Sequence, residues 1–195
     1  MKVTISPYVI FMGLIFFISK KLDMLIVPLI AATVHEFGHL CMALLLNIPI
    51  QKIEINLFGA LIHTKNLNCS YKNEALLAAA GPAANILSAS ITMMLFRFSP
   101  FFQSDKIFYF IVSSVAFAII NLLPAENFDG GRILSCMMLC RFDPKMVKIV
   151  LECMSFFCFF LLWSISVYFI IRTGAYLSLF VFSGALFSKM FLSQE

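Results

Sequence analysis

The feature that most constrains the fold of this chain is a succession of long apolar runs separated by short polar connections. Hydrophobic residues make up 62% of its 195 residues and charged residues only 12%, whereas an average soluble domain has about 25% charged residues. A run of about 20 apolar residues is long enough to cross a bilayer as a helix. The sequence therefore predicts an all-α polytopic protein that lies in a lipid bilayer, with about six transmembrane helices.

The positions of the runs and of the basic residues predict a topology. The expected helices are Ile5 to Ser19, Leu22 to Leu46, Ala75 to Phe96, Ile107 to Leu123, Val147 to Ile171 and Ala175 to Leu192. Lys and Arg are more frequent in the connections on the side of the amino terminus, so the positive-inside rule places both termini in the cytoplasm. The net charge of +4 is spread along the chain without a basic cluster, so no nucleic-acid partner is expected.

The second apolar run contains the sequence His-Glu-Phe-Gly-His at residues 35–39. Ionisable groups are costly at membrane depth, and those that occur there are usually functional. On a helix, His35 and His39 lie one turn apart and project from the same face. Two imidazoles at this spacing can bind Zn²⁺, and Glu36 beside them is placed to accept a proton from a water molecule. The pattern predicts a catalytic site with one Zn²⁺ per chain.

A catalytic zinc usually has three protein ligands and one open position, so this helix lacks one ligand. Asp129 is the first choice, because Gly130 and Gly131 allow the backbone to come close to the ion, just after Pro124 interrupts the fourth span. A cap for the helix that begins near Gly131 is the alternative role of Asp129. Other candidates for the third ligand are Glu126, then Asp143, and His63.

The polar stretch between the second and third spans alternates apolar and polar residues over positions 52–57, which indicates a half-buried strand. Residues 58–60 can form a turn and residues 61–64 a second strand, so we expect a small membrane-associated β-hairpin. Its edge could hold an extended peptide by strand addition, and the candidate substrate-binding residues here are Ile53, Ile55 and Gly59. A connecting loop with chance alternation is the alternative.

Asn85 ends the sequence Gly-Pro-Ala-Ala-Asn in the third span. A polar side chain in apolar surroundings needs a hydrogen-bond partner. Either Asn85 ties two helices together or it contacts the backbone of a substrate, and the sequence leaves both roles open.

Three motifs, at residues 35–39, 81–85 and 121–132, together resemble the site-2 protease family of intramembrane zinc metalloproteases, in its compact, sporulation-type form. The resemblance covers about Leu22 to Arg132. It implies that His35, His39 and Asp129 bind zinc, that Glu36 activates water, and that Asn121 holds the substrate backbone. One departure is Asn127, which stands where relatives commonly have Pro. We expect one membrane domain over residues 1–195, with a catalytic core at about 22–132 and accessory C-terminal helices at about 147–192.

The predicted function is therefore hydrolysis of a peptide bond in a membrane-associated regulatory protein, that is, regulated intramembrane proteolysis. The resemblance suggests a sigma factor precursor or an anti-sigma factor as the substrate, and the bacterial cytoplasmic membrane as the location. One alternative is a zinc-binding membrane protein that transports or senses metal without hydrolysis. Another is a membrane metalloprotease of a different type, whose third ligand is a downstream Glu.

Overall fold

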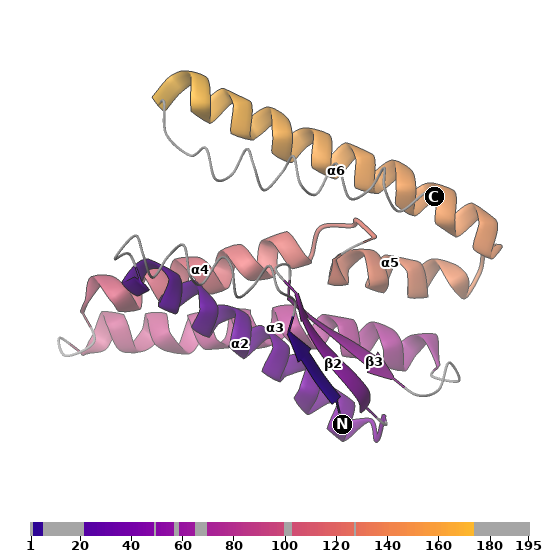
Figure 1. The fold of residues 1–195 in the computed structure, drawn as a ribbon, viewed down its shortest axis with the longest axis horizontal. Helices are drawn as coiled ribbons and strands as arrows, with labels where there is room; N and C mark the ends of the chain where they lie inside the picture. The colour runs from indigo at the N-terminus through magenta and orange to yellow at the C-terminus, as the bar shows by residue number, and fades with distance from the viewer. Residues whose placement is uncertain are drawn as a thin grey trace. The chain divides into compact units, whose positions relative to one another are not determined.

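The computed structural model describes residues 2–5, 22–48, 50–56, 59–64, 70–99, 103–126 and 128–173. These residues form three strands and five helices (Figure 1) and divide into two compact units, Met1–Leu122 and Leu123–Glu195. The elements of the first unit are β1 (Lys2–Ile5), α2 (Leu22–Leu45), β2 (Ile50–Asn56), β3 (Gly59–Thr64), α3 (Tyr71–Phe98) and α4 (Asp105–Asn121). Those of the second are α5 (Asp129–Leu139) and α6 (Pro144–Thr173). The predicted single domain stays a prediction.

Helix α2 buries one stripe of small and polar side chains. The buried residues recur every four positions and are Ala31, His35, His39 and Ala43, so they lie on one face of the helix. Gly38 lets α3 approach α2 closely, because a Cβ at this position would lie 2.5 Å from the carbonyl oxygen of Ala80 and 2.6 Å from Cβ of Ala84.

Helix α2 ends where Asn47 adopts a left-handed backbone conformation, with φ of 52°. The amide of Ile48 donates to the carbonyl of Ala43 at 2.9 Å, and the amide of Asn47 donates to that of Leu44 at 3.1 Å. This pair of bonds is the Schellman motif, in which Asn is one of the few residues other than Gly to adopt the left-handed position. It turns the chain out of the helix towards β2.

Helices α2, α3 and α4 pack against one another (Figure 1). Their buried positions are mostly small or polar, while many large apolar side chains are exposed. The buried residues of α3 and α4 are Leu77, Ala78, Gly81, Pro82, Asn85, Ala89, Ile111, Ser114 and Ala118. The exposed ones include Leu87, Met94 and Ile119. Small residues at the contacts and large apolar residues outside are typical of helices that associate within lipid.

The expected fold class, all-α with about six transmembrane helices and a two-stranded hairpin, is wrong. The described strands form a three-stranded mixed sheet in the order β1-β2-β3. β2 and β3 pair antiparallel close to the predicted ranges, but β1 also pairs with β2 in parallel, with Val3 opposite Ile53. A four-residue strand carries almost no periodicity of its own, and its partner lies some 50 residues away in sequence.

The number of spans is also corrected. Among the described residues, three helices are long and apolar enough to cross a membrane, and they span Ile26–Leu45, Tyr71–Phe98 and Pro144–Arg172. Helix α4 has only 17 residues and is about 26 Å long at 1.5 Å per residue, short of the roughly 30 Å of bilayer hydrocarbon. Of the expected first and last spans, residues 6–19 and 175–192 lie outside the described part of the chain.

In the second unit, α5 packs beside α6 (Figure 1). Helix α6 begins with Pro144, whose fixed φ suits the first position of a helix, and the amide of Val147 donates to the carbonyl of Asp143. The buried stripe of α6 comprises Val147, Leu151, Ser155 and Phe159. Phe159 meets Phe128 edge to face, with ring centroids 6.1 Å apart, and so contacts the segment that leads into α5.

Candidate metal centre

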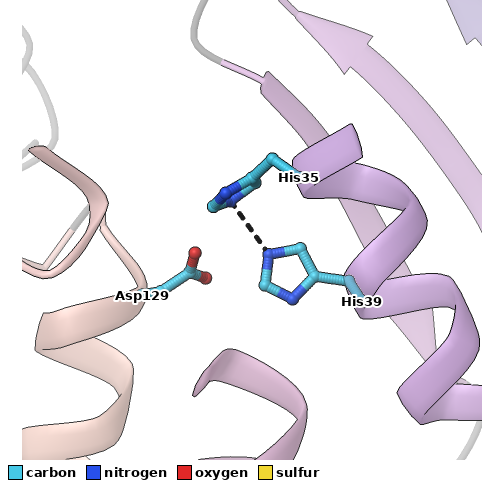
Figure 2. A group of neighbouring side chains, drawn as sticks. All are labelled: His35, His39 and Asp129. Atoms are coloured by element: carbon cyan, nitrogen blue, oxygen red, sulfur yellow. Dashed lines mark hydrogen bonds between the residues drawn. The ribbon is translucent and has the colours of Figure 1, made fainter. Parts of the chain in front are cut away.

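Helix α2 presents His35 and His39 side by side (Figure 2). Their Nε2 atoms are 3.1 Å apart, and only 4% and 6% of the two residues are exposed. Two nitrogens that bind one zinc ion at 2.0–2.1 Å in tetrahedral geometry lie about 3.3 Å apart. The observed separation therefore fits one ion bound by both rings, as the spacing of the two histidines predicts.

The ring of His39 is oriented by the backbone of α3. Its Nδ1 lies 2.8 Å from the carbonyl oxygen of Leu77. Because a carbonyl only accepts, Nδ1 carries the proton and donates it, which leaves a lone pair on Nε2 of the neutral ring. Metal-binding histidines are usually fixed in this way by a partner on the other nitrogen. The sequence could not reveal this contact, because every residue has a backbone carbonyl.

The ring of His35 is contacted by Asn85 of α3. The Asn85 side-chain nitrogen lies 3.3 Å from Nδ1 of His35, and Asn85 is completely buried. Of the two roles left open by the sequence, the structure thus supports the link between two helices. This contact joins α3 to α2 at His35, which is one of the candidate metal ligands.

Gly81 leaves the space that the two rings occupy. A Cβ at this position would lie 2.7 Å from Cε1 of His39 and 2.8 Å from Cε1 of His35, and closer still to Nε2 of His39. The sequence suggested only that small residues here let helices approach. Its one further signal is that Gly81 precedes Asn85 by four residues, which puts both on the same face of a helix.

Glu36 follows His35 directly in α2 and is half-buried. Its place in the helix, directly after His35, is the one that the motif predicts. Its role as a proton acceptor stays a prediction.

Asp129 is the first residue of α5 in the second unit, and it is 7% exposed. Nη1 of Arg132, one turn further on, lies 3.8 Å from Oδ1 of Asp129 and forms an ion pair with it. Among the described residues, the group of His, Cys and acidic side chains that could hold a metal ion is His35, His39 and Asp129, the residues drawn in Figure 2.

Helix α6 and a tight turn hold the segment that precedes Asp129. Oγ of Ser155 accepts a hydrogen bond from the amide of Glu126 at 2.9 Å and donates one to the carbonyl of Leu151 at 2.7 Å. Gly131 allows α5 to begin directly against this turn, because a Cβ there would lie 2.5 Å from the carbonyl carbon of Ala125. The C-terminal helix, expected to be accessory, thus contacts the loop that carries the third candidate ligand.

The structure places the remaining candidates elsewhere. Glu126 is exposed although its amide is bound, and Asp143 is exposed just before α6. Asn121 is the last residue of α4 and donates to the carbonyl of Phe117 in its own helix at 3.0 Å. The candidates in the sheet are Ile53 and Ile55 of β2, opposite Ile62 and Ala60, and Gly59 and His63 of β3, opposite Asn56 and Lys52. Asn127 lies outside the described residues.

The long apolar helices define a membrane protein, and two known proteins are similar to it in fold or in sequence. The structure is similar to the site-2 protease from Methanocaldococcus jannaschii, with a TM-score of 0.68 over 99% of this chain and 90% of that one, at 15% sequence identity. At this identity the likeness is one of fold.

In sequence, the chain is 26% identical over 136 residues to Stage IV sporulation protein FB of Bacillus subtilis (strain 168). The match covers 69% of this chain and spans about half the length of that relative, 46%. No protein-family model matches the chain. The two similarities confirm the resemblance to the site-2 protease family that the three motifs predict.

Proposed function

We propose that this chain is an intramembrane zinc metalloprotease that hydrolyses a peptide bond of a membrane-associated protein. The observation that carries the proposal is the buried pair His35 and His39. Their Nε2 atoms are separated as two ligands of one ion would be, and Nδ1 of His39 is engaged by Leu77. Glu36 follows His35 directly in the sequence, and the similarity to site-2 proteases gives the fold a matching precedent.

In this proposal His35, His39 and Asp129 hold one zinc ion. Bound zinc supplies Lewis acidity, which polarises a peptide carbonyl and makes water a better nucleophile at neutral pH. Glu36 accepts the proton of the attacking water and then delivers it to the leaving amine. His39 keeps its Nδ1 proton on the Leu77 carbonyl throughout, so its lone pair stays directed to the ion.

The substrate is proposed to be a regulatory protein tethered to the membrane, such as a sigma factor precursor or an anti-sigma factor. The proposed location is the bacterial cytoplasmic membrane, with both termini in the cytoplasm. Asn121 and residues Ile53, Ile55 and Gly59 of the sheet are proposed to contact the substrate backbone. Support for these contacts comes from the resemblance and, for Gly59, from its place on the edge strand β3, since an edge strand can add an extended peptide. Ile53 and Ile55 lie on the central strand β2, which is paired on both sides, so their proposed role rests on the resemblance alone.

The decisive experiment compares cells that carry the wild type with cells that carry Glu36→Gln. The substitution removes the proton acceptor and leaves the three proposed ligands in place, so uncleaved substrates should accumulate in the membrane fraction while the zinc content is retained. Quantitative proteomics of that fraction measures the first effect and metal analysis of the purified protein measures the second. Glu152→Gln, in a half-buried residue of α6 paired with Lys148 at 3.7 Å, is the matched control and should behave as the wild type.

Undiminished cleavage by Glu36→Gln would refute the proposal. Zinc binding by the wild type without any difference in cleavage between the two would favour the alternative of a metal-binding protein that does not hydrolyse peptides. The third ligand is tested separately. Zinc content should fall in Asp129→Ala and persist in Glu126→Ala, and the reverse result would transfer the role to Glu126.

A further inference from the structure

The amide of Asn85 has one atom bonded and one atom orphaned. Its Nδ2 lies 3.3 Å from Nδ1 of His35, whereas its Oδ1 is buried without a hydrogen-bond partner. An unsatisfied buried polar atom is uncommon and calls for an explanation, such as a functional role or an alternative orientation. Because Asn85 is wholly buried between packed helices, bulk water does not provide the missing donor.

The positions of the protons on the two imidazole rings determine which atom of the Asn85 amide can face His35. As drawn, Nδ2 of Asn85 donates to Nδ1 of His35, and the proton of His35 must then lie on Nε2, which faces Nε2 of His39 at 3.1 Å. His39 keeps its own proton on Nδ1, bonded to Leu77. This chain of donors is self-consistent, but it occupies the lone pair with which His35 would bind a metal.

A metal bound to Nε2 of His35 requires the other arrangement. The proton of the neutral ring then lies on Nδ1, and Nδ1 needs an acceptor. Rotation of the Asn85 amide by about 180° replaces Nδ2 by Oδ1 at this position, and amide nitrogen and oxygen have nearly the same shape. The same rotation gives the orphaned oxygen the partner that it lacks.

We propose that Asn85 is the positioning residue of His35 and accepts the Nδ1 proton of this ring through Oδ1 when metal is bound. Asn85 and the Leu77 carbonyl then perform the same task for the two histidines, and both come from one face of α3. Metal binding and the tautomer of His35 are coupled through this amide. The inference rests on the proposed function only in that His35 and His39 hold a metal ion.

The test compares side chains at position 85 that can accept a hydrogen bond with a side chain of similar size that cannot. Asn85→Asp supplies only acceptor oxygens, Asn85→Leu keeps the size without any polar atom, and Ser114→Ala removes a different fully buried polar group, on α4. The dissociation constant for Zn²⁺ is measured on each purified full-length variant in detergent, by competition with a chelator of known affinity. Loss of an outer partner of a ligating histidine typically weakens metal binding by about 10- to 100-fold.

We expect Asn85→Leu to bind Zn²⁺ at least tenfold more weakly than the wild type, and Asn85→Asp to bind it as tightly or more tightly. Ser114→Ala should match the wild type. Equal weakening in Asn85→Asp and Asn85→Leu would overturn the proposal, because an acceptor would not then restore binding. Unchanged affinity in Asn85→Leu would overturn it as well.

Thermal unfolding of the zinc-free variants separates folding from metal binding. If Asn85→Leu fails to fold, Asn85→Ser takes its place, because its shorter side chain retains an acceptor. We expect Asn85→Ser to bind Zn²⁺ more weakly than both the wild type and Asn85→Asp. A wild type that binds no Zn²⁺ contradicts the proposed function itself. A wild type that binds Zn²⁺ together with an unaffected Asn85→Leu contradicts only the role of Asn85.

Discussion

Gly81→Ala should remove the metal site while leaving the helix bundle folded. The new Cβ would lie 2.7 Å from Cε1 of His39 and 2.8 Å from Cε1 of His35, whereas ordinary contact begins at 3.4 Å. The His35 ring must therefore move by about 0.6 Å, and the His39 ring by more than about 0.7 Å, because its Nε2 lies closer still to the added Cβ. The atoms that the Cβ meets are the ends of side chains, which can rotate away, so the backbone of α3 has no reason to shift.

The magnitude follows from how precisely a metal site must be built. Functional groups tolerate displacements of about 0.5 Å, and Gly81→Ala exceeds that limit at both histidines at once. We expect Zn²⁺ affinity to fall at least 100-fold, which corresponds to about 2.8 kcal/mol of binding free energy. Replacing Gly by Ala inside a helix should by itself favour the folded state by roughly 0.5–1 kcal/mol.

The assay measures two quantities on the same purified protein. Chelator competition gives the dissociation constant for Zn²⁺, and thermal unfolding without metal gives the midpoint of the folded protein. Loss of affinity with an unchanged or higher midpoint is the expected result. Wild-type affinity in Gly81→Ala would refute the reasoning, since it would mean that the rings do not bind the ion where the structure places them.

Three further predictions concern the helix contact, the Asp129 loop and the metal. Gly38→Ala should lower the unfolding midpoint through about 1–3 kcal/mol of overpacking, because its Cβ meets the backbone of α3 at Ala80; an unchanged midpoint would contradict this close approach. Ser155→Ala should cost about 1 kcal/mol of unfolding free energy by depriving the Glu126 amide of its acceptor and should weaken Zn²⁺ binding, whereas Ser164→Ala, which removes a similar bond within α6, should leave Zn²⁺ affinity unchanged. Equal zinc affinities in these two serine variants would show that the contact of Ser155 with the loop before Asp129 does not contribute to metal binding. Chelation of zinc should lower the unfolding midpoint reversibly, by an amount corresponding to about 2.7 kcal/mol when free zinc had been 100 times its dissociation constant; a midpoint insensitive to zinc in calorimetry would argue against a bound ion.

Local patterns were sufficient to predict the parts of the site that depend on one helix. The four-residue spacing of His35 and His39 places their rings together without reference to the rest of the fold. The bounds of α2 and α3 also lie within a few residues of the predicted spans, because apolar runs of this length have few other structures open to them. The alternation at residues 52–57 indicated a strand for the same local reason.

Contacts between distant segments could not be predicted in this way. Leu77 and Asn85 reach the histidines only because a particular face of α3 meets α2, and that face is selected by close packing at Gly38 and Gly81. Ser155 supports the loop before Asp129 from 29 residues further along the chain. The pairing of β1 with β2 likewise joins segments whose sequences contain no mutual signal.

The shortness of α4 has a consequence for the surrounding lipid. At about 26 Å, this helix is several ångströms shorter than the hydrocarbon layer of an average bilayer. Short hydrophobic segments are accommodated by local thinning of the bilayer, at a modest free-energy cost for each ångström of mismatch. Since α4 packs against the helix that carries His35 and His39, a thinner bilayer on this side would shorten the path by which water travels from the aqueous phase to these two buried histidines.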